Sequence, residues 1–301
     1  MKIAALGSPE SWYCRDIQRA VEGRGHEFLH LEYSHLPGRI SDDSPPATII
    51  AGNPRINSDS RLRDLAELDG LIVRTMAPGS LEQVVFRMNV LGQLADRGTL
   101  VVNPPRAIEC AVDKYLTTAR LQSNGIPVPG TAVCERSEEA MLWFEQLGGD
   151  TVVKPVFGSE GRGIIRVSDP DLAWRTFRTL ERLDAVIYQQ QFIVTDGTDL
   201  RVLVLGDGIL GGMQRIATQG FRTNVSQQGQ ALPCRLSDQE KELAQKACRA
   251  VGANFAGVDL IYNRSDCLVL EVNAVPGWRA FRKVTGLDVA DRLIDWVETN
   301  R

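Results

Sequence analysis

Short apolar segments alternate with amphipathic segments over the first hundred residues, and this order constrains the fold more than any other feature. Lys2–Leu6 is apolar, and an amphipathic stretch, residues 12–22, follows it and is closed by glycines. Strands that alternate with helices favour a parallel sheet covered by helices. Further short apolar runs that we expect to be strands cover residues 26–33, 47–51, 70–74 and 99–102. We therefore predict an α/β domain over residues 1–103, which ends where Pro104 and Pro105 follow.

The rest of the chain has a different pattern. We predict one helix over residues 107–123 and another over 238–251. Two strands, 151–155 and 164–167, flank the Gly-rich segment 158–163, so they predict a hairpin-like flap. Beyond residue 186 the pattern is mostly β, with strands expected over 186–193, 200–205, 209–215, 258–262 and 268–273. We take residues 104–190 as a central subdomain with the flap, and residues 191–301 as a C-terminal subdomain.

Composition excludes several classes of protein. Of 301 residues 43% are hydrophobic and 24% charged, which is typical of a folded chain. The net charge of −4 is too balanced for a protein that mainly coats nucleic acid or anionic lipid. No apolar run approaches the roughly 20 residues that cross a bilayer, so we expect no membrane partner. The six cysteines form no C-x-x-C pair, which argues against structural zinc and for a cytoplasmic protein with reduced thiols.

Two segments near the C-terminus predict an acidic hairpin. If residues 263–267 form its turn, Asp259 faces Glu271, with Cβ atoms about 5 Å apart. Asn273 lies on the same face as Glu271, because side chains along a strand repeat every second residue. Such all-oxygen ligands suit Mg²⁺ or Mn²⁺, and a cation would offset the cost of burying two carboxylates. The alternative is an edge hairpin whose carboxylates are solvated.

Two lysines are candidate phosphate ligands. Lys154 ends an apolar strand, and Lys114 follows Asp113 on the predicted helix. A lysine at a strand end either binds phosphate, pairs with an acid or extends to solvent. The glycines after Lys154 favour phosphate, because a glycine backbone lets a ligand approach closely. Yet the segment matches neither the P-loop nor the G-x-G-x-x-G pattern.

Arginines on the predicted strands form a third group. Fork-shaped guanidinium groups could hold a phosphate, an acyl phosphate or a carboxylate if they face the acidic hairpin. Ordinary surface or structural arginines are the alternative. The residues concerned are Arg201, Arg215 and Arg222.

The order of these features resembles that of the ATP-grasp ligases, in particular the RimK-like amino-acid ligases. The resemblance extends from the first residues to the last helix. It implies an ATP-grasp fold, of mixed α/β class, with an N-terminal Rossmann-like pre-ATP-grasp domain. The matching stretches are Asp113-Lys114, Val153-Lys154-Pro155 with residues 158–163, Gln190-Gln191-Phe192-Ile193, Asp199-Leu200-Arg201, Phe221-Arg222-Thr223-Asn224, Ala256-Gly257-Val258-Asp259 and residues 270–277.

The resemblance also implies a role for each matching residue. ATP would contact Lys114, Lys154, Gly158, Ser159, Gly161, Gly163, Gln190, Gln191, Phe192, Ile193, Asp199, Arg222, Thr223 and Asn224. Two Mg²⁺ or Mn²⁺ ions would be held by Asp259, Glu271 and Asn273. Catalysis would use Arg201, Arg215 and Arg222, and the substrate would contact Arg74, Arg215 and Asn224. Two departures from the family pattern are Gln191, where Glu is frequent, and Val275, where Ser is common.

The implied activity is ATP-dependent formation of an amide bond through an acyl phosphate, with L-glutamate or a similar amino acid as the amine. Residues 73–88 resemble the branch that acts on tetrahydromethanopterin-type pterins. A ribosomal-protein tail, a deazaflavin coenzyme or a carrier protein is an alternative acceptor, and the family habit suggests a dimer or tetramer. Within residues 73–88, Arg74 is either a substrate ligand or a domain-interface residue.

Two alternatives of another class stay open. One is a non-catalytic ATP-binding regulator. The other is a nicotinamide-dependent oxidoreductase, which the segment Gly7-Ser8-Pro9-Glu10-Ser11 disfavours because it lacks the G-x-G-x-x-G pattern.

Overall fold

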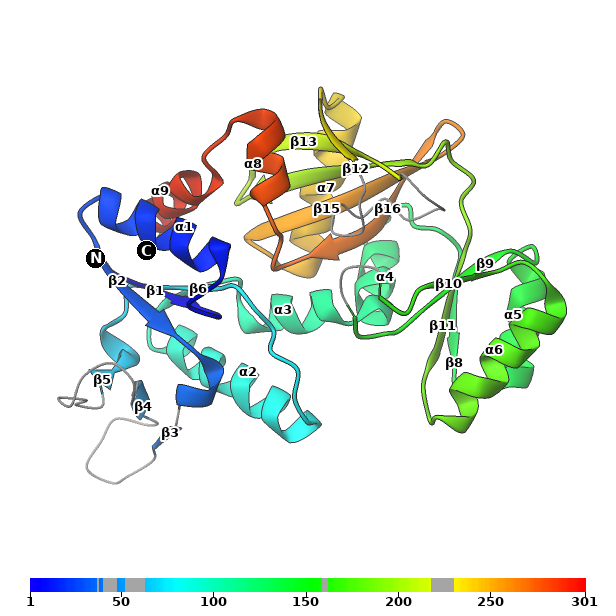
Figure 1. Cartoon of the computed structure of the whole chain (residues 1–301), viewed down its shortest axis with the longest axis horizontal. Coiled ribbons are helices and arrows are strands. Elements are labelled where there is room, and N and C mark those ends of the chain that lie inside the picture. The colour runs from blue at the N-terminus through cyan, green and yellow to red at the C-terminus, as the bar shows by residue number, and fades with distance from the viewer. Residues whose placement is uncertain (37, 40–47, 52–62, 159–161, 218–229) are drawn as a thin grey trace.

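The computed structural model describes residues 1–36, 38–39, 48–51, 63–158, 162–217 and 230–301. Its first sheet is parallel, in the order β2-β1-β6-β7, as the alternating pattern predicts. The strands are β1 (Lys2–Leu6), β2 (Glu27–Leu31), β6 (Gly70–Val73) and β7 (Leu100–Val102). Alternate strand residues face opposite sides. Helices α1 (Trp12–Gly23) and α9 (Val289–Asn300) therefore cover one face, and α2 (Leu81–Asp96) covers the other (Figure 1).

One predicted strand lies outside this sheet. The apolar run at 47–51 forms β4 (Thr48–Ala51), which pairs antiparallel with β3 (Gly38–Arg39) and β5 (Arg63–Asp64) in a separate small sheet. Residue 47 itself is outside the described residues. The expectation that this run joins the parallel sheet is wrong. Parallel neighbours are joined by a crossover connection, and β6, not β4, is the strand that pairs in parallel beside β1.

The helix predicted over residues 107–123 is broken in two. The structure has α3 (Pro105–Val112) and α4 (Lys114–Ser123), and Asp113 between them has an extended backbone, with φ −92° and ψ 103°. The Asp113 carboxylate accepts a hydrogen bond of 2.9 Å from the Leu116 backbone N–H. Asp113 is therefore the N-cap of α4, and it places Lys114 in the first turn of that helix.

Loss of this cap should destabilise α4. We expect Asp113→Ala to lower the free energy of unfolding by about 1 kcal/mol, because an N–H at the helix start loses its acceptor. Asp113→Ser should restore most of the loss, since serine is also a good N-cap. Urea denaturation followed by circular dichroism measures both variants. Equal stability of the alanine variant and the parent chain would contradict the cap.

A second sheet forms the right side of the molecule in Figure 1. Its strand order is β10-β9-β11-β8, and its pairs are antiparallel. The strands are β8 (Thr131–Cys134), β9 (Thr151–Lys154), β10 (Ile165–Val167) and β11 (Ile187–Gln191). Helices α5 (Ser137–Gln146) and α6 (Pro170–Arg182) pack on it through Phe144 and Phe177. The predicted β9–β10 hairpin is confirmed, whereas the boundary proposed between residues 190 and 191 falls inside β11.

The third sheet carries the predicted acidic hairpin. Its order is β14-β13-β12-β15-β16. The strands are β12 (Thr198–Leu205), β13 (Gly208–Ile216), β14 (Gln230–Cys234), β15 (Phe255–Asn263) and β16 (Asp266–Asn273). Helix α7 (Asp238–Val251), with the predicted bounds, packs on one face, and α8 (Arg279–Thr285) lies on the other.

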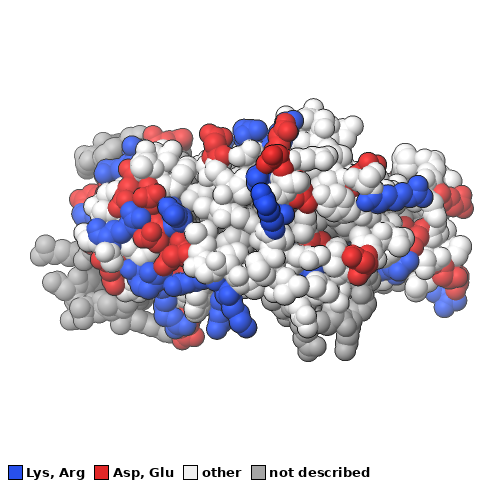
Figure 2. All heavy atoms as spheres, turned by 90° about the horizontal axis from the view of Figure 1, so that it is seen from above, with Lys and Arg blue, Asp and Glu red and all other residues white. Residues whose placement is uncertain are grey.

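The surface carries charges of both signs. On the face shown in Figure 2, Lys and Arg side chains are interspersed with Asp and Glu side chains. Ion pairs also link the first and last helices, since Arg24 beside α1 pairs with Asp291 and Glu298 of α9. Over the part of the chain that is described, no helix has the length and apolar character of a membrane span.

Candidate active site

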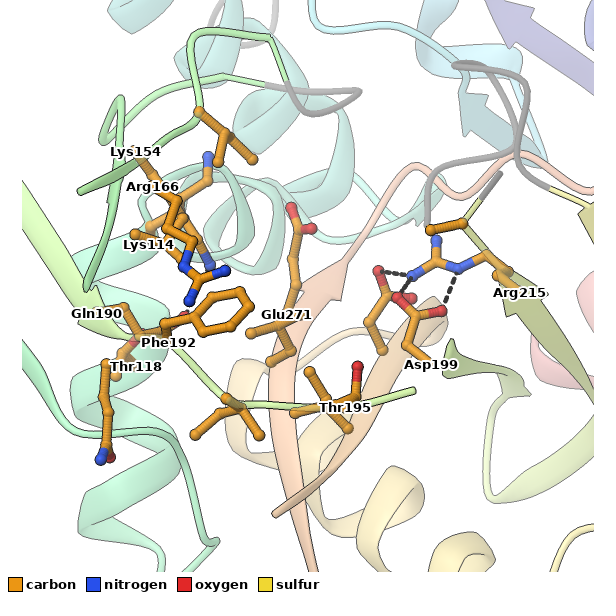
Figure 3. A pocket seen from close by; sticks show the side chains of 18 of the residues that line it. Lys114, Thr118, Lys154, Arg166, Gln190, Phe192, Thr195, Asp199, Arg215 and Glu271 are labelled. Atoms are coloured by element: carbon orange, nitrogen blue, oxygen red, sulfur yellow. Dashed lines mark hydrogen bonds and ion pairs between the residues drawn. The ribbon is translucent and has the colours of Figure 1, made fainter. Parts of the chain in front are cut away.

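Residues that are far apart in the sequence meet around one cavity. It has a volume of about 580 Å³ and is lined from both the second and the third sheet (Figure 3). Cavities of roughly this size hold small-molecule ligands and cofactors. The predicted site residues that line it are Lys114, Lys154, Gly158, Gln190, Gln191, Phe192, Ile193, Asp199, Arg215, Asp259 and Glu271.

Both predicted lysines reach this cavity. Lys154 comes from the end of β9, and burial lowers the pKa of its ammonium to about 8, although Glu271 opposes the shift. Lys114 comes from the start of α4, and burial also lowers its pKa. The Lys114 Nζ donates a hydrogen bond of 2.9 Å to the Gly158 carbonyl, so it contacts the beginning of the Gly-rich segment. The two cations form a positive wall that suits phosphate.

The acidic pair forms as predicted, although the predicted turn is wrong. The turn is shorter than expected, because Asn263 pairs with Asp266 and Tyr262 with Cys267. A bulge between Asp259 and Leu260 then shifts the register by one residue. Asp259 consequently faces Glu271 after all. In Figure 3 Glu271 stands between the two lysines on one side and Arg215 on the other.

Asp259 lies in a buried network with two arginines. Arg201 donates to both of its carboxylate oxygens, from Nε and Nη2, at 2.7 Å each. Arg215 contacts the same carboxylate at 2.8 Å and makes a two-pronged pair with Asp199 at 2.6 Å. Although burial raises the pKa of Asp259, the two arginines outweigh it and hold that pKa below its ordinary value. Arg201 and Arg215 therefore have carboxylate partners from the protein itself.

The residues predicted to hold metal fit a hard divalent cation in their chemistry. Asp259 and Glu271 offer carboxylate oxygens from opposing strands, and Asn273 follows on the same face of β16. Asn273 Oδ1 accepts a 2.9 Å hydrogen bond from the Val275 N–H and is not part of the cavity wall, yet an amide oxygen has a second lone pair. Within the described residues no group of three or more His, Cys, Asp and Glu side chains is arranged around one metal position. The fit thus depends on the two carboxylates and the amide together.

The segment 191–193, which the resemblance predicts to contact ATP, runs along the cavity from the end of β11. Two of its backbone N–H groups are already bonded, Gln191 to the Gly130 carbonyl at 2.7 Å and Phe192 to the Asp150 carbonyl at 2.9 Å. If the base of ATP binds to the main chain here, it would therefore contact backbone groups of residues 191–193 other than these two N–H groups. The Phe192 ring is covered by the Arg166 guanidinium, 3.6 Å from the ring centroid.

Several cavity residues were not predicted from the sequence. Arg166 is one, and Asp150 fixes its guanidinium with hydrogen bonds of 2.9 and 2.6 Å. Tyr188 and Thr118 are others, and their hydroxyls lie 3.0 Å apart. The strand period offered a signal for Tyr188, because it lies two residues before Gln190 and so shares its face.

Part of the predicted site lies outside the described residues. This applies to Ser159, Gly161, Arg222, Thr223 and Asn224. Gly163, at the end of the Gly-rich segment, has φ +71°, and a Cβ there would come within 2.9 Å of Pro155 Cγ. Both facts explain why glycine occupies position 163.

Arg74 lies away from the cavity wall. It follows β6, and its guanidinium is buried between the rings of Tyr13 and Trp278, at 4.9 and 4.3 Å. Its Nη2 donates to the Pro276 carbonyl at 2.9 Å, while Nε has no hydrogen-bond partner among the described residues. Burial lowers the pKa of Arg74 to about 10. Arg74 therefore holds the segment that follows β16 against the first sheet, and a substrate contact stays a prediction.

Known proteins resemble the chain in sequence and in fold. A family model described as the RimK-like ATP-grasp domain matches residues 111–297. A protein of Haemophilus influenzae strain Rd, named "Probable alpha-L-glutamate ligase", is 32% identical over 100% of this chain and 98% of its own length. The tetrahydromethanopterin:alpha-L-glutamate ligase of Methanosarcina acetivorans is 32% identical over 98% of this chain and 97% of its own.

A solved structure agrees with these matches. The ATP-grasp ligase PsnB, complexed with a minimal precursor, Mg and ADP, superposes with a TM-score of 0.73 over 99% of this chain and 97% of its own. At 20% sequence identity this similarity concerns the fold. The family model covers more than half of the chain, and the two relatives are similar over nearly its whole length. The chain belongs to the RimK-like ATP-grasp family.

Proposed function

We propose that this chain uses ATP to join the amino group of L-glutamate to a carboxylate of an acceptor, with release of ADP and phosphate. The named functions of the full-length relatives support a glutamate ligase. The observation that carries the proposal is the cavity itself, where Lys114 and Lys154 face Glu271 across a space large enough for a nucleotide. Cations opposite a carboxylate suit a triphosphate that brings a divalent cation.

The cavity residues suggest where each part of ATP binds. Lys114 and Lys154 would hold the phosphates, and the Gly-rich segment that begins at Gly158 would cover them. Residues 191–193 would lie along the base. Mg²⁺ or Mn²⁺, two ions in our proposal, would be held by Asp259, Glu271 and Asn273. Bound there, the metal would neutralise charge on the transferred phosphoryl group.

The chemistry needs no nucleophile from the protein. An acceptor carboxylate oxygen attacks the γ-phosphorus of ATP, the bond to the bridging oxygen breaks, and ADP leaves. The glutamate amine then attacks the acyl carbon, phosphate leaves, and the nitrogen loses a proton to give the amide. Lys114 and Lys154 counter the charge of the transferring group. Arg201 and Arg215 would orient carboxylates, and their pairing with Asp259 and Asp199 keeps both guanidinium groups in fixed positions.

A tetrahydromethanopterin-type pterin is the acceptor we propose, on the basis of the Methanosarcina acetivorans relative. An ADP-release assay with ATP, Mg²⁺ and L-glutamate tests it against a deazaflavin, a glutamate-ended peptide and a carrier protein. Release that requires both glutamate and the pterin would support the proposal. Release with the peptide alone would assign a protein tail instead.

A non-catalytic ATP-binding regulator is the second candidate. The ion pairs of Asp259 favour it, because Arg201 and Arg215 already bind a carboxylate that is predicted to hold metal. Such a regulator would bind ATP tightly but release no ADP with any acceptor. The same assay, combined with calorimetric titration of ATP, therefore separates the two functions.

Nucleotide affinity should depend on pH through Lys154. Below a pKa of about 8 this lysine is a cation in the free protein, and above it the amine is neutral. A neutral amine attracts phosphate less, so we expect the affinity for ADP to fall as pH rises from 7 to 9.5. The fall should approach about tenfold per pH unit above the pKa. Calorimetric titration at several pH values measures it, and Lys154→Arg should bind with little change over this range.

A further inference from the structure

Gln190 occupies the wall of the cavity directly beside Lys154. It is buried on β11, only 2% exposed. Its side-chain Oε1 accepts a hydrogen bond of 2.7 Å from Lys154 Nζ. Its Nε2 lies 3.0 Å from Thr131 Oγ1 and 3.3 Å from the Tyr188 hydroxyl. Both ends of the amide are thus bonded to the protein.

The surrounding bonds fix which end of this amide faces the lysine. The Thr131 hydroxyl donates its only proton to the Pro129 carbonyl, at 2.8 Å. Thr131 Oγ1 can therefore only accept a further hydrogen bond, so it requires the NH₂ end of Gln190. The carbonyl end must then point at Lys154. This is the orientation that a lysine ammonium needs, because it has donors and no acceptor.

The sequence predicts that Gln190 contacts ATP, yet the geometry points to an indirect action. We propose that Gln190 is a positioning residue, whose side-chain carbonyl anchors the Lys154 ammonium toward the nucleotide and whose amide does not itself contact the nucleotide. This inference rests on the proposed function in one respect, namely that the anchored Lys154 binds phosphate. The anchoring of Lys154 can be tested without any nucleotide.

The anchor opposes an unfavourable environment. Lys154 is partly buried, and burial disfavours an ammonium group. A carbonyl oxygen at 2.7 Å stabilises the charged form by accepting a hydrogen bond from it. The other titratable groups that face Lys154 from neighbouring elements are Lys114 of α4, Tyr188 of β11, Asp259 of β15 and Glu271 of β16. They are unchanged in the Gln189 and Gln190 variants described below.

The chain offers a matched control on the same strand. Gln189 is also buried, but it faces the other side of β11, where its Nε2 donates to the Ala140 carbonyl at 2.7 Å. Gln189→Met and Gln190→Met each remove one buried amide from adjacent positions. Only Gln190→Met removes the acceptor of Lys154. A merely structural role for Gln190 would make the two variants behave alike.

The first measurement is the titration of Lys154 in the nucleotide-free protein. The ¹⁵Nζ resonance of Lys154, assigned with Lys154→Met, reports its protonation by NMR between pH 6 and 11. We expect the midpoint to fall by about one pH unit in Gln190→Met, since a hydrogen bond to a charged group is lost. It should stay unchanged in Gln189→Met and rise in Gln190→Glu, which restores an acceptor and adds a negative charge. Equal midpoints in the parent chain and Gln190→Met would overturn the proposal.

The second measurement is the affinity for ADP with Mg²⁺ as a function of pH. At pH 9 the dissociation constant of Gln190→Met should exceed that of the parent chain by about tenfold, whereas at pH 6.5 the two should agree within about threefold. Gln189→Met should follow the parent chain at both values. A loss of affinity that is equal at both pH values would overturn the proposal, because it would show a direct contact. If the parent chain binds no nucleotide, the proposed function is wrong, while the Lys154 titration still decides the role of Gln190.

Discussion

Glu271→Gln should reduce acceptor-dependent ADP release by at least about a thousandfold, without unfolding the protein. Glu271 faces Asp259 across the β15–β16 pair and points into the cavity opposite the two lysines. Within the described residues no arginine pairs with it, whereas Asp259 has two arginine partners. Glu271 is therefore the carboxylate most available to a divalent cation, and loss of such a cation costs several kcal/mol of transition-state stabilisation.

The measurement is steady-state ADP release with saturating ATP, Mg²⁺, L-glutamate and the accepted acceptor. Asp266→Asn is the matched control, because Asp266 is an exposed carboxylate at the other end of β16. It should keep activity within about twofold of the parent chain, as surface charges contribute little. A Glu271→Gln protein with more than a tenth of the parent activity would remove Glu271 from the proposed metal ligands.

Arg215→Met should be among the most destabilising substitutions in the chain. Arg215 is almost fully buried and pairs with both Asp199 and Asp259. Its removal leaves Asp199 without its two-pronged partner and Asp259 with Arg201 alone. Because an uncompensated buried charge is costly, we expect the free energy of unfolding to fall by about 3–5 kcal/mol. Urea denaturation monitored by circular dichroism at neutral pH measures the change.

Two controls show that the loss comes from the buried charge. Arg175→Met removes an arginine that pairs with Asp171 on an exposed face of α6, and it should change stability by less than about 0.5 kcal/mol. The double variant Arg215→Met, Asp199→Asn should recover part of the loss, because it also removes the charge of one of the two carboxylates with which Arg215 pairs. If Arg215→Met were no more destabilising than Arg175→Met, the network would not stabilise the fold.

The acidic hairpin shows how far a local pattern can predict a site. The side-chain period of a strand and the facing of Asp259 with Glu271 were predicted correctly. The turn was not, because the sequence does not reveal that a two-residue turn at 264–265 is compensated by a bulge beside Asp259. The shorter turn and the bulge shift the pairing by one residue in opposite directions, so their effects cancel. The pair was therefore predicted for a geometry that the protein does not have.

The helix break at Asp113 was missed for a different reason. Residues 107–123 have a continuous helical pattern, and aspartate before lysine is compatible with a helix interior as well as with an N-cap. What ends α3 and restarts the chain as α4 is tertiary, since Lys114 bonds through its backbone N–H to the Val156 carbonyl. The break places the Lys114 side chain at the cavity. A helical pattern that continues through residue 113 does not predict this direction.

By itself, the sequence determined the classes of element, the parallel first sheet, the flap hairpin and the residue types that the cavity needs. These follow from local periodicity, from glycine and proline positions and from motif order. Only the tertiary structure decided which charges are paired. Arg201 and Arg215 bond to Asp259 and Asp199 because β12, β13 and β15 are neighbouring strands whose register places these residues together. Gln190 directs its side-chain carbonyl at Lys154 because the Thr131 hydroxyl already donates its proton to the Pro129 carbonyl. Hydrogen bonds and ion pairs depend on distances of a few tenths of an ångström between distant segments, and no local pattern contains those distances.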